Sequence, residues 1–112
     1  MIIKAFYEVY NELGFGFLEK VYQKALLIEL QRLGLFCNSQ KKINVFYKGI
    51  EIGEYFPDII VNDSVVLELK AMESLVPEHE YQLINYLKST EIEIGLLLNF
   101  GEPTLKIKRL AN

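Results

Sequence analysis

The sequence predicts an α/β domain in which a mixed sheet is flanked by helices. Segments with helical spacing of apolar residues stand before and after a block of β-branched and aromatic segments. Two apolar triplets in that block, Ile59–Val61 and Val65–Leu67, offer no polar face to water, so both sides of the sheet are expected to be covered. With 112 residues, 51% of them hydrophobic, the chain is expected to form a single domain over residues 1–112.

Two helices are expected in the first third of the chain. Residues 2–13 are amphipathic and are followed by Gly-Phe-Gly at positions 14–16. A second helix is predicted from Phe17 to Leu33, because apolar residues recur there at spacings of three and four. Gly34 is a suitable residue for its C-terminal end.

Three strand segments are expected to follow as a meander. Residues 43–47 are strand-like, and Lys48–Gly49 is a turn signal. Residues 50–61 and 64–71 are rich in β-branched and aromatic residues, with Asn62–Asp63 between them.

A third helix and two strands complete the predicted order. Pro77 suits the first turn of a helix that runs to about Ser89. Residues 93–101 form a continuous apolar run, typical of a strand covered on both faces. Residues 105–110 alternate like an edge strand. The expected order is therefore α-β-β-β-α-β with one additional C-terminal strand.

Charge and cysteine content limit the class of protein. The net charge of −3 argues mildly against sequence-independent nucleic-acid binding, although a local basic patch is compatible with it. Cys37 is the only cysteine, which excludes an internal disulfide and is typical of a reducing compartment. Lys4, Glu8 and Glu12 make the first segment unlike a signal peptide, and no apolar run approaches the roughly 20 residues of a membrane span. We therefore expect a cytoplasmic protein with no membrane segment.

Three charged residues, Asp58, Glu68 and Lys70, interrupt the apolar strands. If a three-residue loop joins the strands, Asp58 lies directly opposite Glu68, and Lys70 shares their face. A two-residue loop would pair Asp58 with Leu67 and move Glu68 to the other face. In the first register the carboxylates have Cβ atoms about 4.5–5.5 Å apart, which suits one oxygen-ligated divalent cation.

The repulsion between the two carboxylates favours a cation. At an effective dielectric near 20, two like charges about 5 Å apart repel by roughly 3 kcal/mol. One carboxyl would take up a proton unless this charge were offset. Lys70 offsets part of it and a metal would offset more. The other interpretation is a structural ion-pair group, or solvated residues near strand ends.

Polar residues on two helices are expected to border the same pocket. Glu19, Tyr22 and Gln23 share a face of the second helix. His79, Gln82 and Tyr86 share a face of the third. These residues also have structural interpretations. In these, Glu19 is a first-turn acid favoured by the helix dipole, and His79 caps its helix. Gln82 and Tyr86 then border the core.

Two motifs resemble a known family. Asp58 with Glu68-Leu69-Lys70 resembles the Asp…Glu-x-Lys core of the PD-(D/E)XK nuclease superfamily. The Pro-Asp dipeptide of that motif is also present, as Pro57–Asp58. Residues 16–22, GFLEKVY, read as the signature of the GxxExxY protein family. Together with YLKST at 86–90 and GLLLNFG at 95–101, they make the chain similar to that family over nearly its whole length. The resemblance implies a restriction-endonuclease-like core.

The resemblance also implies roles for single residues. Asp58 and Glu68 would be catalytic and would hold Mg²⁺ or Mn²⁺. Lys70 would position the attacking water or stabilise charge on the phosphate. Glu19 would be an auxiliary metal ligand. The residues expected to bind substrate are Tyr22, His79, Gln82 and Tyr86. The chain departs from the family pattern at Tyr10 and Phe15, where His and Pro are frequent.

The function expected from these features is metal-dependent cleavage of phosphodiester bonds in DNA or RNA. One alternative is a non-catalytic nucleic-acid-binding module that uses Lys41–Lys42 and the basic segment Lys106–Arg109. A basic segment of this kind is more often an edge strand protected against aggregation than a phosphate-binding track. Another alternative is a protein-interaction domain with exposed aromatic residues. Because a small acidic chain has little surface for a long polyanion, we expect a homodimer or a protein partner.

Overall fold

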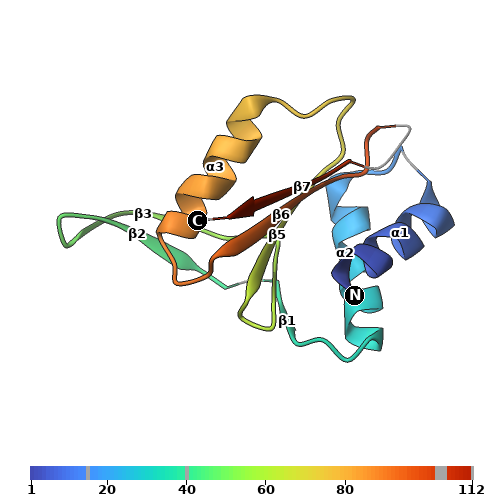
Figure 1. Ribbon diagram of the computed structural model, residues 1–112, viewed down its shortest axis with the longest axis horizontal. Coiled ribbons are helices and arrows are strands. Elements are labelled where there is room, and N and C mark those ends of the chain that lie inside the picture. Colours follow the sequence, from blue (N-terminus) through green and yellow to red (C-terminus); the bar gives the residue numbers. More distant parts are fainter. Residues whose placement is uncertain (15, 40, 103–105, 112) are drawn as a thin grey trace.

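The computed structural model describes residues 1–14, 16–39 and 41–102, and the backbone of residues 106–111. Two helices come first, strands β1 to β5 follow, and α3 precedes the last two strands (Figure 1). In chain order they are α1 (Ile2–Leu13), α2 (Glu19–Arg32), β1 (Cys37–Asn38), β2 (Ile43–Tyr47), β3 (Ile50–Tyr55), β4 (Ile59–Val61), β5 (Val65–Lys70), α3 (Pro77–Lys88), β6 (Ile94–Asn99) and β7 (Lys106–Ala111).

The main sheet has five strands in the order β1-β4-β5-β6-β7. β5 and β6 are parallel and the other neighbours are antiparallel, so the sheet is mixed. Helices α1 and α2 lie on one face and α3 lies on the other (Figure 1). The predicted α/β class, with a mixed sheet flanked by helices, is confirmed. The expected C-terminal strand is present as β7, at the edge of the sheet beside β6.

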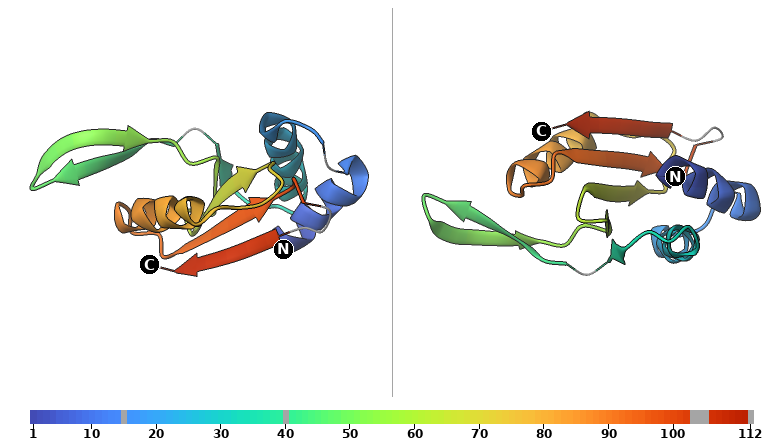
Figure 2. Two further views of the ribbon diagram at one scale, coloured as in Figure 1. Left: turned by 90° about the horizontal axis from the view of Figure 1, so that it is seen from above. Right: turned by 60° about the horizontal axis from the view of Figure 1, so that its bottom comes forward.

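The predicted three-stranded meander is wrong. In the described part of the chain, β2 and β3 pair only with each other, and this two-stranded ribbon projects from the body (Figure 2). The segment predicted as one strand divides at Phe56–Asp58, where Pro57 has no N–H for a strand ladder. The sequence did not predict the short strand β1, which pairs with β4 on the side away from β5.

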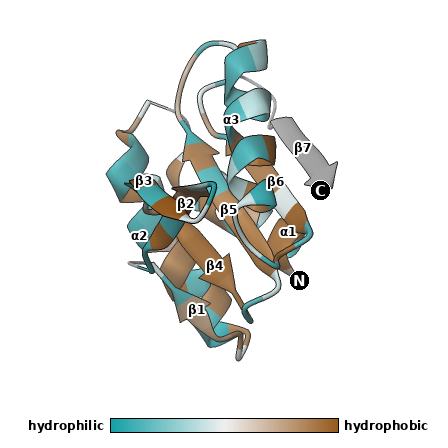
Figure 3. Ribbon diagram, turned by 90° about the vertical axis from the view of Figure 1, so that its left-hand side faces the viewer, coloured by the Kyte–Doolittle hydropathy of each residue, from teal (hydrophilic) through white to brown (hydrophobic). Residues whose placement is uncertain are grey.

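Two apolar layers hold the helices to the sheet. The larger layer lies between the sheet and α1 and α2, and includes Phe6, Leu26, Leu67 and Leu69. The smaller layer lies under α3 and comprises Ile60, Val66, Leu83, Leu87 and Leu97. Strands β4, β5 and β6 are correspondingly rich in hydrophobic residues (Figure 3). The expectation that both sides of β4 and β5 are covered is therefore confirmed.

Tyr22 fixes the connection between α1 and α2. Its side chain is fully buried, and its ring stacks on Phe100 with 4.2 Å between the centroids. Its hydroxyl donates to the carbonyl oxygen of Gly14 at 2.7 Å and accepts from the backbone N–H of Phe17 at 3.2 Å. Gly16 adopts φ of 111°, a conformation that favours glycine. The glycine and the tyrosine of the GxxExxY pattern, Gly16 and Tyr22, therefore shape the entry to α2.

Among the described residues, none of the helices combines the length and the apolar character that crossing a membrane requires.

Candidate active site

The loop between β4 and β5 sets the register that the site depends on. Ile59 pairs with Leu67 and Val61 pairs with Val65, so three residues form the loop. Two of them, Asn62 and Asp63, have positive φ angles near 50°, which these residue types tolerate. One step before Ile59, Asp58 therefore lies opposite Glu68. This is the three-residue-loop register of the two alternatives considered above.

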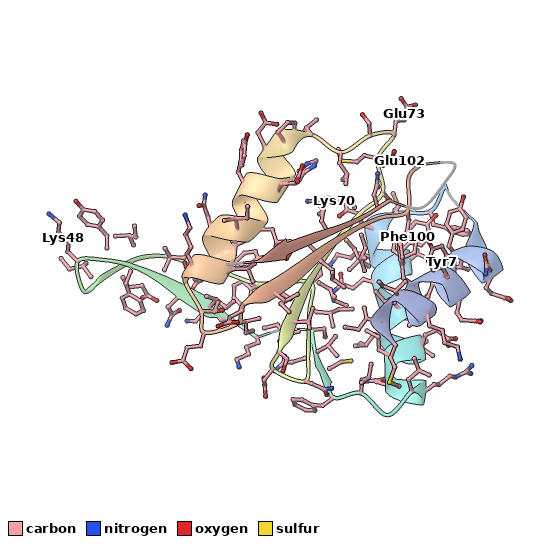
Figure 4. The ribbon with its side chains drawn as sticks, in the orientation of Figure 1. Tyr7, Lys48, Lys70, Glu73, Phe100 and Glu102 are labelled. Carbon is pink, nitrogen blue, oxygen red and sulfur yellow. The ribbon has the colours of Figure 1, made fainter. Side chains whose placement is uncertain are left out.

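The structure brings Asp58, Glu68 and Lys70 together on the side of the sheet that faces α3. The backbone N–H of Leu69 donates to Oδ2 of Asp58 at 2.8 Å, and the N–H of Asp58 donates to Oε1 of Glu68 at 3.3 Å. Lys70 follows two residues after Glu68, so it shares the same face of β5. It lies at the end of the strand on the side of α3 (Figure 4).

Both carboxyl groups are partly buried, and this shifts their proton affinity. Burial, and next the negative charge of Asp58, raise the pKa of Glu68 to about 7, while the charge of Lys70 acts in the other direction. Burial also raises the pKa of Asp58, against the hydrogen bond from Leu69 and the charges of Lys70 and Lys20. The two carboxylates are therefore costly to keep charged without a further cation.

The donor set fits a hard divalent cation. In the part of the chain that the structure describes, protein hydrogen bonds use Oδ2 of Asp58 and Oε1 of Glu68 and leave the second oxygen of each carboxylate without a protein donor. Carboxylate oxygens are the ligands that Mg²⁺ and Mn²⁺ prefer, and Mg²⁺ typically takes one or two of them. Asp58 and Glu68 are thus the residues that could hold such an ion.

Tyr55, at the end of the β2–β3 ribbon, completes the environment of Glu68. Its hydroxyl donates a hydrogen bond to Oε1 of Glu68, and its ring stacks on Tyr86 of α3 at an interplanar angle of 14°. Burial, and next the charge of Glu68, raise the pKa of Tyr55, so the phenol stays protonated as a donor. Sequence reasoning missed this role because the path of the ribbon is not encoded in the local pattern of residues 43–55.

Helix α2 approaches the same site through residues other than the predicted glutamate. Nε2 of Gln23 donates to the backbone carbonyl oxygen of Asp58 at 3.0 Å. The positive charge of Lys20 opposes the rise in the pKa of the Asp58 carboxyl. Glu19 is exposed, one turn before Gln23. The described residues contain no group of three His, Cys, Asp or Glu side chains that could hold a metal, so Glu19 is not brought together with Asp58 and Glu68.

A family model for the PD-(D/E)XK nuclease superfamily matches residues 1–110. The chain belongs to this superfamily. No curated protein and no solved structure matches it. The mixed sheet with helices on both faces is consistent with a restriction-endonuclease-like fold, as the resemblance implied.

The remaining predicted residues lie at different places in this PD-(D/E)XK domain. Tyr86 borders the site through its stack on Tyr55, and Gln82 is exposed one turn earlier on α3. Nδ1 of His79 accepts the backbone N–H of Val76 at 3.4 Å, which is the capping interpretation. Tyr22 is a correction: because it is fully buried with its hydroxyl in use, it serves the core and offers no surface to a substrate.

The basic segment Lys106–Arg109 falls within β7, and its side chains lie outside what the structure describes.

A second residue that the sequence reasoning missed is Asn99, at the end of β6. It is fully buried and pairs with Lys70 across the parallel strands. Its Oδ1 accepts from the backbone N–H groups of Met72 and Gly101, and its Nδ2 donates to the carbonyl of Met72 and to Glu102. Asn99 thereby holds the backbone at Met72, two residues after Lys70. The signal in the sequence was a single polar residue inside the apolar run GLLLNFG.

Proposed function

We propose that the protein is a divalent-metal-dependent nuclease that hydrolyses phosphodiester bonds in DNA or RNA. The observation that carries the proposal is the meeting of Asp58, Glu68 and Lys70 on one face of the sheet, in a chain of the PD-(D/E)XK nuclease superfamily. The finer assignment to the GxxExxY family rests on residues 16–22 and on the structural role of the glycine and tyrosine in that pattern.

Asp58 and Glu68 would hold Mg²⁺ or Mn²⁺. A cation bound there supplies Lewis-acid chemistry, namely charge neutralisation at phosphate oxygens and a lowered pKa for water. Tyr55 would keep Oε1 of Glu68 in place through its hydrogen bond, so that the other oxygen is directed to the ion. Leu69 does the same for Asp58 through its backbone N–H.

Lys70 would act on the phosphate and the water. Its positive charge opposes the rise in the pKa of both Asp58 and Glu68. From this place it can donate a hydrogen bond to the attacking water, or stabilise the negative charge that develops on the phosphate in the transition state. A partly buried lysine is effective in this role because water screens its charge less than at the surface.

Cleavage assays test this proposal. The wild type is expected to cut at least one form of nucleic acid (single-stranded, double-stranded or branched DNA or RNA) when Mg²⁺ is present, and to stop in EDTA. Lys70→Ala is expected to lower the rate by about 100- to 1,000-fold, because it removes a donor to the transition state. Lys4→Ala, an exposed lysine on α1, is the matched control and should leave the rate unchanged.

Two results would contradict the nuclease function: no cleavage of any form by the wild type, or equal rates for the wild type and Lys70→Ala. Binding of nucleic acid without cleavage would favour the non-catalytic module instead.

The proposed enzyme acts with a second copy of the chain or with a protein partner. The net charge of −3 on 112 residues leaves little basic surface for a long polyanion. Strand β7 lies at the edge of the sheet, and among the described residues β6 is the only strand that pairs with it, so another strand could be added there. The single cysteine, Cys37, supports a reducing compartment such as the cytoplasm.

A further inference from the structure

A hollow lies beside the candidate active site, on the side of α2. Its volume is about 410 Å³, within the range of about 300–1,000 Å³ that is usual for ligand sites. We call it the lysine hollow, and it is lined by Lys20, Gln23, Lys24, Leu27 and Ser39.

The lysine hollow and the active site share a wall. Gln23 lines the hollow and also donates through Nε2 to the carbonyl oxygen of Asp58 at 3.0 Å. Lys20 lines it as well, three residues before Gln23 on the same helix. A ligand in the hollow would therefore lie beside the backbone of Asp58.

The lining is chemically suited to an anion. It offers two ammonium groups, an amide and a hydroxyl, and no carboxylate is among the lining side chains that the structure describes. The ion pairs found between described residues use Arg32, Lys41 and Lys42 rather than Lys20 or Lys24. Because like charges one turn apart destabilise a helix, the pair in α2 has a cost that a bound anion would relieve.

We propose that the lysine hollow binds a backbone phosphate of the nucleic acid, close to the phosphate that is cleaved. Lys20 and Lys24 would contact its oxygens, with the hydroxyl of Ser39 as an additional donor. The adjacency to a cleaved phosphate rests on the proposed nuclease function; the affinity of the hollow for a backbone phosphate does not. Such contacts carry no sequence information, so the hollow would fix the path of the strand rather than select its sequence.

The test is the salt dependence of binding to short single-stranded DNA and RNA, measured by fluorescence anisotropy. EDTA is present, so that binding is separated from cleavage. Each phosphate contact to a single strand contributes about −0.7 to the slope of log K against log salt, so Lys24→Ala is expected to make the slope shallower by about that amount. The same slope corresponds to an affinity about fivefold lower at 0.1 M salt. Lys20→Ala should act in the same direction.

Two control variants show whether the charge itself is responsible. Lys24→Arg keeps the charge and is expected to keep the wild-type slope. Lys4→Ala removes an exposed lysine that is not on the hollow, and should do the same. Both Lys24 and Lys4 are exposed helical positions where alanine favours the helix, so loss of folding does not confuse the comparison.

The outcomes separate this proposal from the nuclease function. If Lys24→Ala and Lys20→Ala keep the wild-type slope while Lys70→Ala loses cleavage, the hollow proposal is overturned and the nuclease function stands. If the slope of log K against log salt becomes shallower in both Lys20→Ala and Lys24→Ala but the wild type cuts no nucleic acid, phosphate binding is supported and the nuclease function fails. If the wild type binds none of the oligonucleotides, the hollow proposal is overturned as well.

Discussion

The two faces of strand β5 differ in what their side chains contribute. Towards α1 and α2, Leu67 and Leu69 are buried in the larger apolar layer. Towards α3, Val66 is buried in the smaller layer, and Glu68 and Lys70 follow it. Because residues alternate between faces, one six-residue strand supplies both the core and the candidate site.

The difference shows where this domain accepts a cost in stability. The leucines gain free energy by leaving water. Glu68 instead is partly buried beside Asp58, and its raised pKa measures how unfavourable its charge is there. The face towards α3 thus changes from packing to chemistry between Val66 and Glu68.

Substitutions on the two faces of β5 should therefore have opposite effects on folding. Leu67→Ala is expected to lower the free energy of unfolding by about 2–5 kcal/mol, because it removes buried methyl groups and leaves a cavity. Glu68→Gln is expected to maintain or raise it at pH 8 without metal, because the amide still accepts hydrogen bonds but carries no charge. Urea unfolding at that pH measures both. A greater loss for Glu68→Gln than for Leu67→Ala would contradict this division of roles.

The pH dependence of stability gives a second comparison. The carboxyl of Glu68 has an ordinary pKa of 4.5 and a pKa of about 7 in the folded protein. Between these values the folded state holds more protons than the unfolded state, so the free energy of unfolding falls as pH rises. For the metal-free wild type the fall should reach about 3 kcal/mol.

Urea unfolding across this pH range measures the fall. Glu68→Gln should make the profile flatter, and Leu69→Val, on the other face, should lower it without changing its shape. A wild-type profile that rises from pH 5 to pH 7 would show that the charge of Glu68 is not opposed by its surroundings.

Tyr55→Phe tests a smaller effect, the link between the ribbon and the site. The substitution removes the hydroxyl that donates to Glu68 and keeps the ring that stacks on Tyr86. We expect the free energy of unfolding to fall by about 1 kcal/mol. The affinity for Mg²⁺ should fall by about 10- to 100-fold, because a partner that orients a ligand is lost.

Calorimetric titration of Mg²⁺ measures this affinity, with Tyr81→Phe as the control at an exposed tyrosine of α3. Equal Mg²⁺ affinity for Tyr55→Phe and the wild type would show that Tyr55 does not position Glu68.

The sequence narrowed the geometry of Asp58, Glu68 and Lys70 to two registers, because the length of one loop determines which side chains share a face. The apolar triplets and the polar residues between them limit the loop to two or three residues, and a side-chain period of two then assigns the faces. Either loop length was compatible with the residues, and the pairing of Val61 with Val65 in the structure decides for the three-residue loop. The positive φ angles of Asn62 and Asp63 show why the longer loop is stable.

Other parts could not be predicted because their contacts are not local. Strand β1 has two residues and therefore no period to recognise. The alternation of residues 43–55 is the same whether these strands join the main sheet or pair only with each other. The sequence therefore predicted neither the separate two-stranded ribbon nor the contact of Tyr55 with Glu68. For Tyr22, helical spacing gave the face that it shares with Glu19 and did not give its burial.

The most direct test of a cation site at Asp58 and Glu68 is calorimetric titration of Mg²⁺ into the metal-free protein near pH 7. We predict a single binding event for the wild type, accompanied by proton release, because the ion displaces the proton that Glu68 holds in part at this pH. Asp58→Asn should abolish or strongly weaken it, since one of the two charged ligands is lost. A wild type that binds neither Mg²⁺ nor Mn²⁺, or an Asp58→Asn protein that binds as tightly as the wild type, would contradict the assignment.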